Sequence, residues 1–178
     1  MNCRNTRRIG EETALLSGFE SPPYRMGQVE GPAVDYHYYH SDGEQAAVLS
    51  ATLRGLLRDG VIADEVVVLS RLRFENSCAS QLVDESEFRL VEVGAVKPER
   101  SHISIISFAT IQAFKGMESP VVVLCDVDRI EGRESQSLLY VGMSRARSLL
   151  IVLLHEQTKP FVKQAVARKL EEGWSKSP

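Results

Sequence analysis

The chain has 178 residues, of which 43% are hydrophobic and 25% are charged, with a formal net charge of -3 at pH 7. This length fits one globular domain with a real core, and the acidic total argues against a domain coated in positive charge for nucleic acid, although a local groove stays open. The sequence has no run of 18 apolar residues, and its first residues lack the apolar core of a secretory signal, so we expect a cytoplasmic protein that does not span a membrane.

Three cysteines, Cys3, Cys78 and Cys125, lie far apart in the sequence and form no CxxC pair. This spacing supports neither a zinc site nor a disulfide framework. We therefore expect reduced thiols that are buried or incidental.

The first half of the chain alternates between helices and apolar strands. A short helix at residues 6–16 and an irregular connector precede a strand at 33–40, a helix from Ser41 or Asp42 to residue 58, and a buried strand at 65–70. We predict a helix at 74–83, strands at 88–93 and 102–107, and one or two helical turns at 109–115 that Gly116 stops.

The second half repeats the alternation. Residues 120–127 form the strongest buried strand, followed by a helix at 135–147, a strand at 148–154 and a helix at 158–172. This order predicts an α/β fold with a mainly parallel sheet and helices on both faces. We divide the chain into an N-terminal segment, 1–32, and one α/β domain, 33–178.

Polar residues of the stretch 110–147 cluster at the ends of these apolar elements, where open α/β sheets bind phosphates and nucleotides. Lys115 and Gly116 have a structural interpretation as the last turn and cap of a helix. Arg145 and Arg147 would complement the dipole of the helix they end, or carry a guanidinium to a phosphate. Near the N-terminus, Arg4 lies in a basic segment, NCRNTRR. Judged by its position alone, this segment is a solvated chain end.

Asp126 and Asp128 come at the end of the strongest strand, a position where magnesium can bind. Without further acidic partners, solvated loop residues are the favoured interpretation, and a metal-dependent phosphatase or nuclease remains an alternative. The sequence contains no GxxxxGK[ST], so the chain cannot hold a triphosphate on a P-loop of its own.

Three stretches, taken in order, resemble motifs of the UvrD/Rep/PcrA-like superfamily 1 DNA helicases, specifically of their second RecA-like domain. NCRNTRRI (2–9) resembles motif IV (NYRST), TIQAFKGMES (110–119) resembles motif V (TxHxxKGLE), and LLYVGMSRAR (138–147) resembles motif VI (LxYVAxTRA). The resemblance implies a three-layer RecA-like domain of the P-loop NTPase type, without its own Walker A loop.

The resemblance also implies roles for individual residues. ATP with Mg²⁺ would lie in a cleft between this domain and an N-terminal RecA-like P-loop domain of the same protein, which would supply most magnesium ligands. Arg4 and Arg145 would be arginine fingers to the γ-phosphate. The residues expected at the nucleotide are Lys115, Gly116, Glu118 and Cys3, with Gly116 near the γ-phosphate and Glu118 on the ribose. Thr110 and Gln112 match positions that touch single-stranded DNA.

Departures from the motifs leave a second hypothesis open. Cys3 replaces an aromatic residue that packs on adenine, Gln112 replaces a frequent histidine, and Ser135 and Gln136 stand where arginines often precede motif VI. The favoured function is the C-terminal motor domain of a monomeric ATP-dependent DNA helicase, inactive as an isolated chain. The alternative is a catalytically inert RecA-like module that binds protein or DNA.

Overall fold

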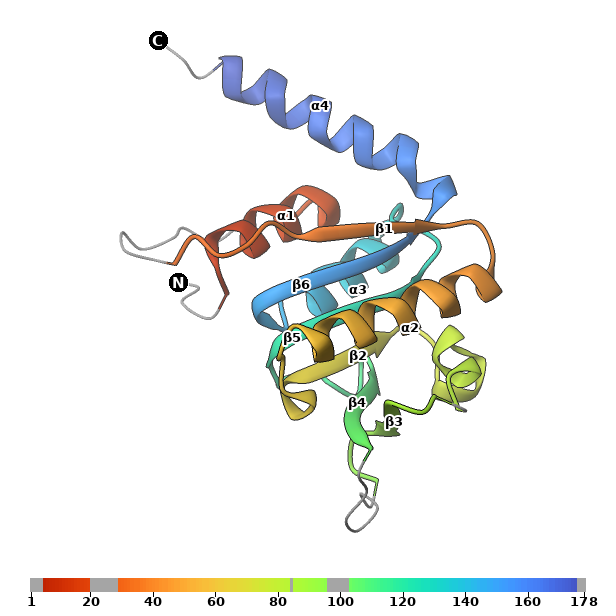
Figure 1. The fold of residues 1–178 in the computed structure, drawn as a ribbon. Helices are drawn as coiled ribbons and strands as arrows, with labels where there is room; N and C mark the ends of the chain where they lie inside the picture. Colours follow the sequence, from red (N-terminus) through yellow and green to blue (C-terminus); the bar gives the residue numbers. More distant parts are fainter. Residues whose placement is uncertain (1–4, 20–28, 84, 96–102, 176–178) are drawn as a thin grey trace.

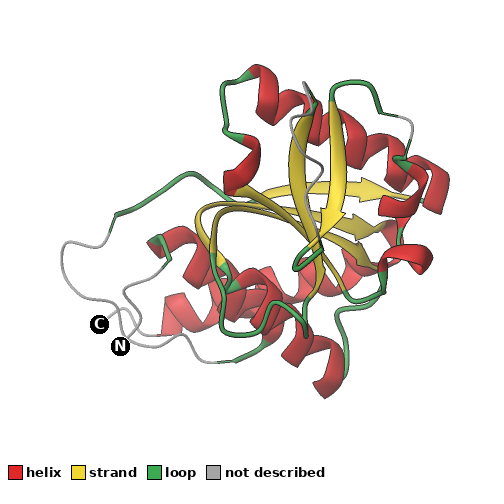
Figure 2. Ribbon diagram, turned by 90° about the horizontal axis from the view of Figure 1, so that it is seen from below, coloured by secondary structure: helices red, strands yellow, loops and turns green. Residues whose placement is uncertain are grey.

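The computed structural model describes residues 5–19, 29–83, 85–95 and 103–175. Within these ranges a six-stranded sheet has the order β1-β6-β5-β2-β4-β3, and every neighbouring pair is parallel (Figures 1 and 2). The strands are β1 (Asp35–Tyr39), β2 (Val66–Ser70), β3 (Phe88–Glu92), β4 (Ser104–Thr110), β5 (Ser119–Val127) and β6 (Ala146–His155). The helices are α1 (Arg7–Ser17), α2 (Asp42–Arg58), α3 (Arg133–Met143) and α4 (Lys159–Ser175).

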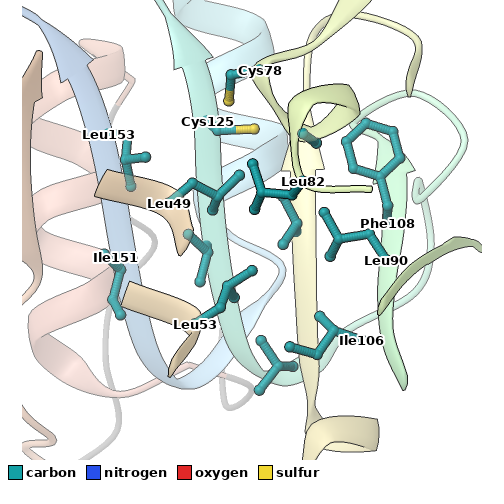
Figure 3. Close-up of a cluster of buried hydrophobic side chains, with 14 of the residues drawn as sticks. Leu49, Leu53, Cys78, Leu82, Leu90, Ile106, Phe108, Cys125, Ile151 and Leu153 are labelled. Carbon is teal, nitrogen blue, oxygen red and sulfur yellow. The ribbon is translucent and has the colours of Figure 1, made fainter. Parts of the chain in front are cut away.

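Both faces of the sheet are covered because the middle of each central strand is apolar at successive positions. Successive side chains of a strand point to opposite faces. On β2, Val66 and Val68 pack with α2, whereas Val67 and Leu69 pack with α1 and α3. Figure 3 shows the first of these layers, in which Leu49 and Leu53 of α2 lie over the sheet. The predicted three-layer α/β fold is confirmed.

Helix ends follow the sequence signals closely. Thr6 and Ser41 are the N-caps of α1 and α2, and their side chains accept hydrogen bonds from the amides of Ile9 and Glu44. Gly18 ends α1 with φ of 69°, in the left-handed conformation that glycine adopts without strain. None of the described helices is both long enough and apolar enough to cross a membrane.

The helix predicted at 74–83 is wrong. Two 3₁₀ turns, η2 (Phe74–Asn76) and η3 (Cys78–Gln81), replace it, and Ser77 between them has an extended backbone. The Ser77 hydroxyl accepts a hydrogen bond from the amide of Ala79, and it donates one to Asp126. Serine side chains compete with helical backbone bonds in this way, so a continuous helix does not form.

Two further boundaries differ from the prediction. β4 continues to Thr110, which pairs with Ser70 of β2, so residues 111–116 form a turn where helical turns were predicted from 109. The predicted helix 135–147 is α3, which begins earlier and ends at Met143, and Ala146 already pairs with Ser119 of β5. The arginines at 145 and 147 therefore do not lie in a last helical turn.

Candidate functional site

One end of the sheet, where β5 and β6 begin, gathers residues that are far apart in the sequence. Asn5 is buried there, and its Nδ2 donates hydrogen bonds to the carbonyls of Ser144 (2.9 Å) and Ala146 (2.6 Å). The amide of Thr6 donates to the carbonyl of Arg147 at 3.2 Å. These bonds fix the residues just before α1 against the turn between α3 and β6. We call this end the amino edge.

Arg145 lies in that turn, and its side chain is half-buried. Its Nε donates to the carbonyl of Val141 (3.0 Å) and its Nη1 to the carbonyl of Met117 (3.3 Å). The Arg145 carbonyl accepts from the amide of Ser119 at 3.0 Å. Among the described residues no carboxylate pairs with Arg145, so no ion pair compensates its charge at this edge.

The turn 111–116 leads from the end of β4 toward this edge, and within it the Lys115 amide donates to the carbonyl of Gln112 at 3.2 Å. Gly116 has φ of 90°, which favours glycine, and a Cβ there would meet no atom within 4 Å. The side of Gly116 that lacks a side chain is therefore open, and Lys115 beside it is exposed.

Glu118 completes the group at the amino edge. Its carboxylate lies 3.8 Å from the guanidinium of Arg147, and both side chains are more than a third exposed, at 38% and 55%. An exposed pair at this distance contributes little to stability.

An open recess of about 590 Å³ adjoins this ion pair. The carboxyl end of α2 lines it with Asp59, and the strands β5 and β6 line it with Pro120 and Arg147. The recess is continuous with the amino edge through Arg147, so this part of the surface is hollowed and polar.

The two residues predicted to touch DNA lie at the other end of the sheet, the carboxyl edge. Thr110 ends β4, and Gln112 is exposed in the following turn. Ser70 pairs with both Thr110 and Cys125, whereas β5 begins at Ser119. The two edges are therefore separated by about 20 Å along the strands. The stretch 110–147 contributes to two places and not to one site.

Asp126 is not a solvated loop residue, which corrects the prediction. It lies in β5 with 7% of its surface exposed, and it accepts hydrogen bonds from the hydroxyls of Ser70 and Ser77. Asp128 instead pairs with Arg71 on the surface. The two carboxylates therefore have different protein partners, which gives the alternative of a paired metal site no support.

Cys78 and Cys125 are buried free thiols, as predicted. Their sulfur atoms and a carboxylate oxygen of Asp126 lie within 4.8 Å of one another, a grouping that could in principle hold a metal ion. Burial raises the pKa of the Cys125 thiol well above its ordinary value, so this thiol stays protonated.

Cys3 and Arg4 lie outside the described residues. The structure therefore places Glu118 and Arg145 at the amino edge and Thr110 and Gln112 at the carboxyl edge, with Lys115 and Gly116 in the turn between them. Sequence reasoning missed Asn5, whose side chain binds the backbone of the turn that carries Arg145. Its position next to Arg4 in NCRNTRR was the only signal in the sequence that could have indicated it.

Residues 106–153 match the family model of the UvrD-like helicase C-terminal domain. Over this range the chain is similar to that domain. The match runs from β4 to β6, so it includes the turn with Gly116 and the turn with Arg145. The resemblance to the UvrD-like helicases is confirmed at this level.

A solved structure has the same fold over most of the chain. It is the C-terminal domain of a possible DNA helicase from Lactobacillus plantarum WCFS1, with a TM-score of 0.64 and 15% sequence identity, over 87% of this chain and 88% of that chain. At this identity the likeness shows the fold, which is RecA-like. No curated protein matches this chain in sequence.

Proposed function

We propose that this chain is the C-terminal motor domain of an ATP-dependent DNA helicase or translocase. ATP with Mg²⁺ would bind between its amino edge and a P-loop domain of the same protein. One observation carries the proposal: three separate motif-like stretches meet through side-chain hydrogen bonds to backbone carbonyls. The side chain of Asn5 donates to Ser144 and Ala146, and the side chain of Arg145 donates to Met117. Convergence of these stretches is what a shared nucleotide cleft requires.

The chemistry available at this edge fits half of such a cleft. A guanidinium can stabilise the negative charge that develops on a transferred phosphoryl group, which is worth roughly a thousandfold or more in rate. Arg145 supplies the guanidinium, and its bonds to the carbonyls of Val141 and Met117 orient it. Gly116 offers an open backbone for close approach of a phosphate, and Glu118 offers a carboxylate acceptor for a ribose hydroxyl. Arg4 would act as a second arginine finger, and Cys3 would lie beside the base.

Single-stranded DNA would lie across the carboxyl edge, where Thr110 and Gln112 are expected to touch it. Separation of the two edges suits a motor, since closure of the cleft at one edge can shift DNA contacts at the other through the rigid sheet.

The test is Arg145→Ala in the protein that joins this chain to its P-loop domain. We expect DNA-stimulated ATP hydrolysis to fall about a thousandfold, with ATP binding largely intact, because the finger acts on charge that develops in the transition state. Arg145→Lys should rescue little, because an ammonium lacks the planar fork of donors. Arg89→Ala is the matched control, since Arg89 is exposed on the edge strand β3.

Near-normal turnover of the Arg145→Ala protein would remove Arg145 from the mechanism. If the unaltered joined protein binds single-stranded DNA but shows no DNA-stimulated hydrolysis, the alternative of an inert RecA-like interaction module replaces the proposal.

A further inference from the structure

Asp126 has an unusual backbone for its position in a strand. Its φ is 58°, and among the described residues no other non-glycine residue has a positive φ. Aspartate tolerates this left-handed region better than most residues, but the conformation still costs free energy unless its surroundings fix it. The surroundings of Asp126 are therefore informative.

Four donors converge on the buried carboxylate of Asp126, and one of them is the thiol of its neighbour Cys125, at 3.4 Å. Ser70 and Ser77 donate through their hydroxyls, each at 2.5 Å, and the amide of Cys78 donates at 3.2 Å. Ser70 ends β2, and Ser77 and Cys78 begin η3. One carboxylate thus holds the end of β5 to two other segments at the carboxyl edge.

Ser70 connects Asp126 to the turn that follows β4 through further hydrogen bonds. Its carbonyl accepts a hydrogen bond from the amide of Ile111 at 2.8 Å, and its hydroxyl also accepts from the amide of Leu72 at 2.8 Å. Ile111 immediately precedes Gln112, and the hydroxyl of Thr110 accepts from the amide of Ala113 at 3.1 Å. A continuous path of hydrogen bonds therefore runs from Asp126 through Ser70 to the turn that carries Gln112.

We propose that Asp126 is a positioning residue for the edge that binds single-stranded DNA, and that it acts through Ser70 on the turn 111–116. This inference rests on the proposed function, because it assigns a purpose to the edge where Thr110 and Gln112 lie. A carboxylate suits the role, since it accepts several donors at once and its hydrogen bonds are stronger than neutral ones.

The experiment uses the full chain and a set of matched variants. Asp126→Asn keeps the shape and the tolerance for positive φ but loses the charge and one acceptor. Asp126→Gly relieves the backbone and loses every side-chain bond. Ser70→Ala removes only the first hydrogen bond of the path. Glu85→Gln is the control, since Glu85 is another largely buried carboxylate that binds a serine hydroxyl, Ser50, away from the turn.

Binding of a fluorescent oligo(dT) is measured by anisotropy at fixed salt, and amide hydrogen exchange is measured over residues 111–116. We expect the Kd to rise about tenfold in both Asp126 variants and in Ser70→Ala, which corresponds to the loss of one charge-assisted hydrogen bond. Exchange in the turn should accelerate in the same three variants and not in Glu85→Gln. In the protein joined to its P-loop domain, the DNA concentration for half-maximal stimulation should rise while turnover at saturating DNA is kept.

The outcomes separate this inference from the proposed function. If the unaltered chain binds oligo(dT) and the three variants bind it equally well, the positioning role is wrong and the helicase proposal stands. If the unaltered chain binds no oligo(dT), both fail at this edge. If Glu85→Gln weakens DNA binding as much as Asp126→Asn, general loss of stability explains the effect and the inference is overturned.

Discussion

Carbonyl oxygens hold the guanidinium of Arg145, and within the part of the chain that the structure describes no carboxylate pairs with it. A carboxylate partner would orient the guanidinium but would also cancel part of its charge. The carbonyls of Val141 and Met117 orient it while leaving the positive charge intact. The side chain is therefore preorganised for an anion, which is the arrangement that electrostatic catalysis needs.

A second carboxylate supports a prediction about stability and pH. The hydroxyl of Ser50, and after it the guanidinium of Arg54, lower the pKa of Glu85 below its ordinary value. A lowered folded-state pKa means that the stabilisation is present at neutral pH and is lost as the pH falls through the folded-state value. Glu85→Gln should therefore cost about 1 kcal/mol at pH 7, since part of the interaction is exposed to solvent.

Urea unfolding of both proteins from pH 7 down to pH 3 checks this prediction. The difference between them should be constant at neutral pH and shrink below the ordinary glutamate pKa of 4.5. Ser50→Ala should show the same window with a smaller amplitude. A difference that does not change with pH would mean that packing, and not the charge, stabilises this contact.

Single residues mark the limit of what the sequence could predict. Gly116 and Arg145 stand in recognisable patterns, so the roles proposed for them come from the sequence. Asp126 could not, because three of its four donors lie about 50 residues earlier in the chain and only the fold brings them together. A solvated loop was the reasonable expectation for an aspartate beside a second aspartate.

At the scale of the element, the first turn of α1 is hydrogen-bonded to residues 29 and 30, which come after the helix in the chain. The amides of Arg7 and Arg8 donate to the carbonyls of Val29 and Glu30, at 3.0 and 3.3 Å. Helix N-termini leave such amides without helical partners, so this segment acts as a cap made of backbone. Asn5, directly before α1, lies at the amino edge, and the attachment therefore bears on the site.

Gly31 is the residue that allows this close approach. Its φ is 74°, and a Cβ there would lie 2.4 Å from the Cβ of Thr6, which no rotation of the Thr6 side chain can relieve. Gly31→Ala should lower the free energy of unfolding by about 2–4 kcal/mol, from the positive φ and the overlap together. Chemical denaturation of both proteins measures this difference in the free energy of unfolding.

Gly55→Ala is the matched control for that substitution. Gly55 lies inside α2, and a Cβ there would meet nothing within 4 Å. The same change should stabilise the protein by about 0.5–1 kcal/mol at this position. If Gly31→Ala were as stable as the unaltered chain, the segment 29–31 would not pack on α1 in solution as described.

Periodicity predicted strands more reliably than it predicted short helical pieces. The run at 120–127 is apolar at nearly every position, which admits only a strand buried on both faces. Residues 74–83 have helical spacing, but Ser77 bonds to the distant Asp126 and breaks the helix. The predicted helix 135–147 continues past the observed end of α3, because the sequence does not show that Ala146 pairs with Ser119. Tertiary pairing decided both cases.

At the scale of the whole molecule, the parallel sheet explains why one stretch of sequence serves two edges. A chain that leaves a strand at one edge must cross a face before it enters the next parallel strand. Residues 111–118 make that crossing between β4 and β5, so Gln112 stays at the carboxyl edge and Glu118 arrives at the amino edge. Six residues separate a proposed DNA contact from a proposed nucleotide contact, which is a short path for coupling the two.

Under the proposed function, this chain and the P-loop domain each hold part of the ATP site. The sequence has no P-loop, and under the proposed function the fingers at the amino edge act only on a phosphate that another domain holds. Residues 1–178 alone should therefore hydrolyse no ATP above the background measured without protein, in phosphate-release assays with Mg²⁺ and oligo(dT). Addition of the P-loop domain of the same protein should restore hydrolysis, and a chain with Arg145→Ala should not. Robust hydrolysis by the unaltered chain alone would show that it holds a complete active site, and the half-site at the amino edge would have to be abandoned.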